Sequence, residues 1–94
     1  MVKIYVSFGT EYESGYGQRP DGILLTLDKD VMLSEINIQT NLGSYECYCR
    51  YSIPEIYYCN TETYSKIENN MINDGYYYLS KNSLSDLGQF FKEV

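Results

Sequence analysis

The chain of 94 residues contains no histidine and no tryptophan. Histidine is the commonest general base near neutral pH and the commonest metal ligand, so its absence excludes every Ser-His-Asp and Cys-His catalytic arrangement. Two carboxylate pairs remain for glycosidase-like chemistry, Glu11 with Glu13 and Asp28 with Asp30, but both fall in segments that we expect to be loops or turns. We therefore predict no catalytic residues and no enzymatic activity.

Cysteine is scarce, and its three copies form no recognised motif. Cys47-x-Cys49 with the distant Cys59 matches neither the C-x₂₋₄-C spacing of structural zinc sites nor the C-x-x-C of redox sites. An odd count also prevents a complete set of intrachain disulfides. The sequence therefore predicts no metal and no cofactor, and it favours reduced, buried cysteines that pack as small hydrophobic residues.

Long apolar runs are absent as well. No run approaches the ~20 residues of a membrane-spanning helix, and the N-terminal MVKIYVSFGTEYE has neither the cationic start nor the cleavage site of a signal peptide. Basic residues are few, seven against thirteen acidic ones, for a net charge of −6. This charge repels phosphate backbones and anionic lipids. We expect a cytoplasmic protein that binds neither membranes nor nucleic acid directly.

Tyrosine, in contrast, is abundant, with twelve copies. Each can bury its ring while its hydroxyl stays in water, which suits a small domain. The stretch 44–60, SYECYCRYSIPEIYYCN, holds all three cysteines and several tyrosines. In a strand, successive side chains point to opposite faces. One face then carries Tyr45, Cys47, Cys49 and Tyr51, and the other carries Glu46, Tyr48 and Arg50.

Apolar alternation predicts most of the strands. Val2–Phe8 alternates cleanly and reads as a half-buried strand. The glycine-rich stretch Gly9–Gly22 is predicted to be a long loop, either functional or mobile. Pro54 cannot donate to a central ladder, so it should interrupt a strand. Further strands are expected at Ile23–Asp28, Tyr45–Ser52, Glu55–Cys59 and Tyr76–Ser80, the last after a turn at Asn73-Asp74-Gly75.

Helical signals are weaker in the middle of the chain than at its end. For residues 29–42 we favour a hairpin over a helix, because Asn37, Thr40 and Asn41 are weak helix formers. A short helix is expected after a cap at Asn60 or Thr61, with Tyr64, Ile67 and Met71 on one face. A C-terminal helix is predicted from a Ser83 cap and the apolar stripe Leu84, Leu87, Phe91 and Val94.

Together these patterns predict one α+β domain spanning residues 1–94. Its sheet is expected to be mostly antiparallel, with about five strands, one short helix and a C-terminal helix.

Tyrosines and carboxylates together suggest a protein-binding surface. Interfaces favour aromatic anchors, and acidic rims steer toward basic partners. The favoured hypothesis is an interaction module for a basic protein. The composition also suits a phage- or mobile-element-encoded anti-defence inhibitor that occludes a nucleic-acid-binding effector. The expected surface comprises Tyr5, Glu11, Tyr12, Glu13, Tyr16, Asp21, Glu46, Tyr48, Glu55 and Tyr77.

Two alternatives remain open. The first is a small-ligand binder for a sugar or nucleotide, in which Tyr12, Tyr16 and Tyr77 line a pocket and the segment Gly9–Gly22 closes over it. The second is a self-associating assembly module, a homo-oligomer whose exposed edge strand pairs with another copy.

Overall fold

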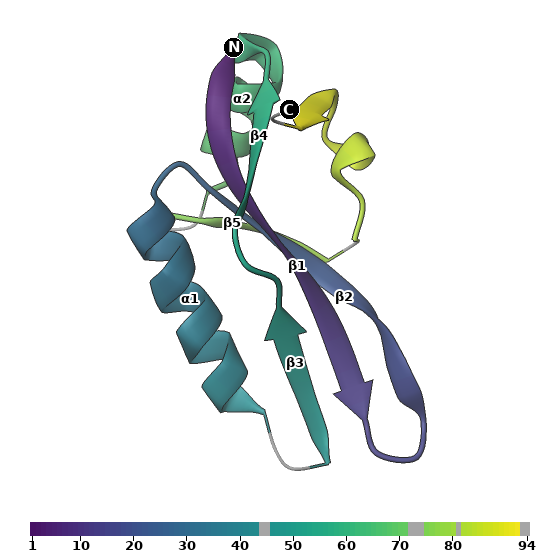
Figure 1. The fold of residues 1–94 in the computed structure, drawn as a ribbon. Helices are drawn as coiled ribbons and strands as arrows, with labels where there is room; N and C mark the ends of the chain where they lie inside the picture. The colour runs from purple at the N-terminus through teal and green to yellow at the C-terminus, as the bar shows by residue number, and fades with distance from the viewer. Residues whose placement is uncertain (44–45, 72–74, 81, 93–94) are drawn as a thin grey trace.

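The computed structural model of this chain describes residues 1–43, 46–71, 75–80 and 82–92. Within them the chain forms strands and helices in mixed order, as Figure 1 shows, which confirms the α+β class. The elements are β1 (Val2–Glu13), β2 (Gly17–Thr26), α1 (Lys29–Leu42), β3 (Cys47–Tyr51), β4 (Glu55–Cys59), α2 (Thr61–Asn69), β5 (Tyr77–Leu79), the 3₁₀ turn η1 (Leu84–Asp86) and β6 (Phe90–Lys92).

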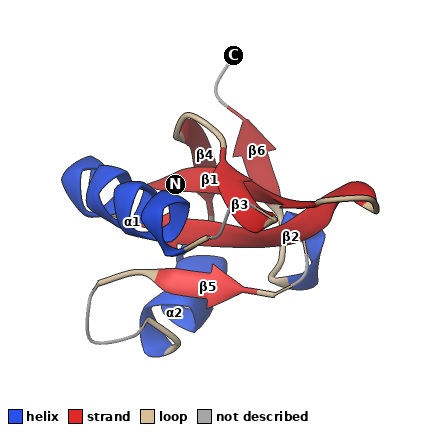
Figure 2. Ribbon diagram, turned by 90° about the horizontal axis from the view of Figure 1, so that it is seen from below, coloured by secondary structure: helices blue, strands red, loops and turns tan. Residues whose placement is uncertain are grey.

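The strands form one six-stranded sheet in the order β5-β2-β1-β4-β6, and β3 also pairs with β1. Every pairing is antiparallel. Figure 2 shows β5 and β6 at opposite margins of this sheet, with α1 and α2 at separate places around it. The long central strand β1 is therefore the element on which the others are arranged.

β3 and β4 share one side of β1. β4 pairs with the first half of β1 and β3 with the second half. Between them, the Ser7 hydroxyl donates to the Ser52 carbonyl at 2.7 Å, and the Phe8 amide donates to the Ser52 hydroxyl at 2.9 Å. The Ser52 amide also donates to the Phe8 carbonyl at 2.9 Å, so Ser52 satisfies both backbone groups of Phe8 where the ladder is interrupted. The break expected at Pro54 is confirmed.

The core lies over the first half of β1. Alternation along β1 buries one row of side chains against the facing row of β2, as the pattern in Val2–Phe8 predicts. The cluster of fully buried residues comprises Ile4, Val6, Ile23, Leu25, Cys59 and Ile67. α2 contributes Ile67, and its first turn is capped as predicted, since the Thr63 amide donates to the Asn60 side chain at 2.8 Å.

The prediction of a long loop at Gly9–Gly22 is wrong. β1 and β2 continue to pair through this stretch until Glu13 faces Gly17. Only a short turn joins them, in which the Tyr16 amide donates to the Glu13 carbonyl at 3.0 Å and Gly15 and Gly17 have φ near 85°. Glycine adopts this conformation without steric cost. Gly15 and Gly17 therefore mark a tight turn, and Gly9 lies at a register shift between Phe8 and Thr10. The polar residues between Thr10 and Asp21 are exposed or half-buried, but those in β1 and β2 belong to paired strands and not to a loop.

The hairpin preferred for residues 29–42 is also wrong, because this segment is the helix α1. Its first turn is capped by Asp28, whose carboxylate accepts from the Asp30 amide at 2.8 Å and the Val31 amide at 3.4 Å. The weak helix formers near its end form local bonds instead of breaking it, for example from the Thr40 hydroxyl to the Ile36 carbonyl at 2.8 Å. Capping and packing thus outweigh intrinsic propensity.

The helix predicted at the C-terminus is wrong as well. Ser83 makes no capping bond to the backbone, and the chain forms only the turn η1 before β6 pairs with β4. Gly88 has φ of 145°, which side-chain-bearing residues rarely adopt, and a Cβ there would lie 2.6 Å from Thr63 Oγ1. Leu84 and Leu87 still pack against the core, but from a turn. Val94 lies outside the described residues.

Two smaller predictions complete the comparison. The strand expected at Tyr76–Ser80 is present as β5, and the turn before it falls partly outside the described residues, which exclude 72–74. None of the helices described is long and apolar enough to cross a membrane.

Candidate binding groove on the hairpin arm

The outer half of the sheet extends away from the core as an arm, which we define as Gly9–Gly22 of β1 and β2 together with Glu46 and β3. The molecule is elongated, with extents of 42 × 25 × 23 Å. In the arm, β1 lies between β2 and β3, and α1 runs alongside β3 (Figure 1). Side chains of the arm are mostly exposed or half-buried, and they are therefore available for contacts outside the chain.

One face of the arm carries a pair of stacked tyrosines. Tyr12 and Tyr48 are directly opposite in register on β1 and β3. Their ring centroids are 5.2 Å apart, with an angle of 14° between the ring planes. The guanidinium carbon of Arg50 lies 5.8 Å from the Tyr12 centroid and 5.4 Å from the Tyr48 centroid. Such cross-strand pairs hold their rings in a fixed orientation.

An open groove of about 960 Å³ runs beside this tyrosine pair. It lies between the tip of the hairpin, β3 and the C-terminal end of α1. The end of α1 approaches closely because residue 43 is glycine, where a Cβ would lie 2.5 Å from Tyr48 Cβ. The lining residues are Tyr12, Glu13, Ser14, Gly17, Gln18, Thr40, Gly43, Glu46, Tyr48 and Arg50.

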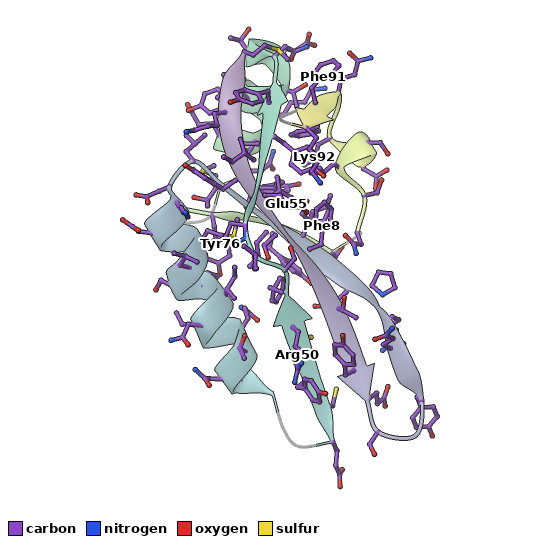
Figure 3. The ribbon with its side chains drawn as sticks, in the orientation of Figure 1. Phe8, Arg50, Glu55, Tyr76, Phe91 and Lys92 are labelled. Atoms are coloured by element: carbon purple, nitrogen blue, oxygen red, sulfur yellow. The ribbon has the colours of Figure 1, made fainter. Side chains whose placement is uncertain are left out.

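The groove contains charges of both signs. Glu46 contributes a carboxylate, and Arg50 contributes a guanidinium, which Figure 3 shows on β3, well away from Glu55. Glu13 also borders the groove, but alternation along β1 directs its side chain to the opposite face, where it is in register with Cys47 and acts electrostatically on Arg19 and Cys47. Over the described part of the chain, ion pairs join Arg19 to Glu11 at 2.9 Å and Lys92 to Glu55 at 2.7 Å. Neither of these ion pairs involves Glu46 or Arg50.

The opposite face of the arm holds the thiols. Cys49 and Tyr51 both donate to the same Asp21 oxygen, each at 3.4 Å, and the Cys47 thiol donates to Glu11 at 3.8 Å. Burial, with the Asp21 carboxylate, raises the pKa of Cys49 to about 11 and also raises the pKa of Tyr51. These thiols therefore stay protonated near neutral pH and are poor nucleophiles.

The three cysteines are free, as expected, but they are not all buried. Cys59 is in the core, Cys49 is half-buried and Cys47 is exposed, because no layer covers this face of the arm. Within residues 1–43, 46–71, 75–80 and 82–92, no group of three potential ligands is placed to hold a metal ion. The alternation predicted for this strand is confirmed for its described residues, and Tyr45 lies outside them.

The structure brings together only part of the predicted surface. Tyr12, Glu13, Glu46 and Tyr48 line the groove. Two more predicted residues, Glu11 and Asp21, lie with the thiols on the opposite face, and Tyr16 stands at the hairpin tip with 84% of its surface exposed. The remaining three are elsewhere: Tyr5 lies under Lys3, Glu55 pairs with Lys92, and Tyr77 packs against the core.

Gln18 and Thr40 complete the groove but were not identified from the sequence. Gln18 belongs to a strand that was predicted as a loop, and Thr40 belongs to the helix that was predicted as a hairpin. No sequence pattern brings these two side chains together, because their proximity depends on how α1 packs beside β3. No protein-family model, curated protein or solved structure matches this chain.

Proposed function

We propose that the protein is a non-catalytic interaction module that binds a basic protein partner through its arm. The observation that supports this proposal is the stacked pair Tyr12 and Tyr48 in an open groove that also holds Glu46. Tyrosine is enriched at interfaces because a rigid ring offers a large contact area at low entropic cost. The Glu46 carboxylate beside the pair, together with the other carboxylates of the arm, favours partners of positive charge.

The charge of the arm supports the same partner class. Glu11, Glu13, Asp21 and Glu46 outnumber the basic residues Arg19 and Arg50 there, within a chain of net charge −6. Carboxylates carry the same sign of charge as phosphates and can occupy a basic surface in their place. The partner we favour is therefore a nucleic-acid-binding protein whose groove the arm occludes, which is the mode of action of an anti-defence inhibitor.

The test is a titration of this protein into a basic nucleic-acid-binding protein by calorimetry, with nucleic acid as competitor. We expect binding that weakens by at least about 10-fold when salt rises from about 0.1 M to about 0.5 M, because screening removes the charge attraction. The double variant Glu13→Gln/Glu46→Gln should weaken binding strongly. Its matched control is Glu62→Gln/Glu68→Gln, which removes the same charge from α2. Equal weakening by both double variants, or binding insensitive to salt, would contradict the proposal.

A second candidate function is favoured by the size of the groove. Its volume of about 960 Å³ is within the ~300–1,000 Å³ typical of small-ligand sites. The amide of Gln18 and the hydroxyl of Thr40 could hydrogen-bond a sugar or nucleotide that stacks on the tyrosines. Tyr16 and Tyr77, expected in such a pocket, do not line it. Titration with neutral sugars and nucleosides, followed by tyrosine fluorescence, tests this; a signal unchanged by Tyr48→Leu counts against it.

A further inference from the structure

We propose that the groove recognises arginine side chains, so that the partner presents an extended, arginine-rich segment and Arg50 is displaced when it binds. The inference deepens the proposed function and rests on it. Three features of the groove support it: a guanidinium already lies against the tyrosine pair, the Glu46 carboxylate in the groove forms no ion pair among the described residues, and Arg50 is exposed enough to move into solvent.

The first feature is the contact of Arg50 with the tyrosine rings. Its guanidinium carbon lies within 6 Å of both ring centroids, at 5.8 Å and 5.4 Å. A planar guanidinium can lie flat against an aromatic ring, whereas an ammonium acts as a compact point charge. The chain's own side chain therefore shows which chemical group the faces of Tyr12 and Tyr48 accommodate.

The second feature is the position of the Glu46 carboxylate. Glu46 is held at the hairpin turn, since the Ser14 amide donates to its carbonyl at 2.8 Å. Its side chain lines the groove that holds the tyrosines. In the part of the chain that the structure describes, Glu46 takes part in no ion pair. A guanidinium entering from outside can stack on a ring and pair with a carboxylate at once, which joins two favourable contacts.

The third feature is that Arg50 is weakly held. Its side chain is exposed, and the ion pairs of the described residues do not include it. Contacts of an exposed cation with an aromatic ring are weak. A partner arginine that adds a carboxylate contact therefore has the advantage over Arg50, which can move into solvent. Removal of Arg50 should consequently favour arginine binding by removing both a competitor and a repelling charge.

The experiment compares octa-arginine with octa-lysine, two probes of equal charge, by calorimetry near pH 7. We expect octa-arginine to bind about 5-fold more tightly, and Tyr48→Leu to remove this preference. Arg50→Gln should tighten octa-arginine binding about 3-fold. Its matched control is Arg19→Gln, which makes the same charge change at Arg19, a residue that pairs with Glu11 on the opposite face, and should have a smaller effect. Circular dichroism verifies that each variant is folded.

The outcomes separate this inference from the proposed function. Equal affinity for the two peptides, still dependent on Glu13 and Glu46, would overturn arginine recognition and leave the basic-partner proposal standing. Binding of neither peptide would overturn both. If Arg50→Gln tightens octa-arginine no more than Arg19→Gln does, the effect is one of net charge and displacement of Arg50 is excluded. Because Arg50 is exposed, this comparison remains available even if Tyr48→Leu fails to fold.

Discussion

At the scale of single residues, glycines make room for tyrosines on the arm. A Cβ on Gly9 would lie 2.7 Å from the ring of Tyr51, and a Cβ on Gly22 would lie 2.7 Å from the ring of Tyr78. The glycines of this stretch suggested a loop, but here a missing side chain lets a large neighbour lie across the sheet. Alternation in 45–51 predicted the two faces of β3 correctly. It could not predict that Cys47 is exposed, because exposure depends on which layers cover the arm.

The carboxylate of Asp21 should control the ionisation of its two neighbours. Burial and this carboxylate raise the pKa of Cys49 from its ordinary 9.0 to about 11. A pKa raised by folding gives stability that is complete below the unfolded value and is lost as pH rises through the folded value. The free energy of unfolding should therefore fall between about pH 9 and pH 11. Asp21→Asn should lower the pKa of Cys49, measured by thiolate absorbance in a Cys47→Ser/Cys59→Ser background.

A matched control for this prediction is Asp86→Asn, which removes a carboxylate from η1. It should leave the titration of Cys49 unchanged. If Asp21→Asn also leaves that titration unchanged, burial alone sets the pKa and the hydrogen bond to Asp21 contributes nothing measurable.

At the scale of elements, capping and packing decide whether a segment forms a helix more than its residue composition does. α1 contains several residues of low helix propensity, yet Asp28 satisfies two amides of its first turn and Met32 is fully buried. The last segment has an apolar stripe at helical spacing, yet it forms η1 and β6, because Gly88 fits against Thr63. The sequence therefore predicted the elements with strong alternation or a clear cap, such as the first half of β1 and α2. It failed where tertiary packing outweighed local preference.

The cap of α1 gives a direct test of this view. Asp28→Ala should lower the free energy of unfolding by about 1 kcal/mol, the typical cost of removing an N-cap side chain. Asp28→Asn can still accept from the Asp30 amide and should cost much less. Urea unfolding followed by circular dichroism measures both. Equal losses for the two variants would mean that the charge of Asp28, and not its capping bond, stabilises the helix.

At the scale of the whole molecule, the core and the groove lie at opposite ends of β1. The fully buried cluster includes Ile4 and Val6, whereas Tyr12 and Glu13 line the groove beyond it. Residues of the arm are mostly exposed or half-buried, so its backbone hydrogen bonds are closer to solvent than those of the core. The acidic and tyrosine-rich composition predicted a contact surface. It could not predict that this surface lies at one end, because that depends on the length of the hairpin.

Hydrogen exchange should reveal this division. Amides of β1 between Val2 and Val6 should exchange only through global unfolding, while those between Thr10 and Glu13 should exchange faster through local opening. Exchange followed residue by residue by nuclear magnetic resonance measures the difference. Uniform protection along β1 would show instead that arm and core open as one unit.

The strand pairing on both sides of β1 is interrupted near the same residues of β1. On one side, the register with β2 shifts between Phe8 and Thr10; on the other, Ser52 spans the gap between β3 and β4. The pairing of the arm is therefore set independently of the pairing in the core. A hairpin of this kind can gain or lose residues in matched pairs without moving a core side chain. Its reach is thus free to vary during evolution, or to be redesigned for a deeper or shallower target, while the folded body stays the same.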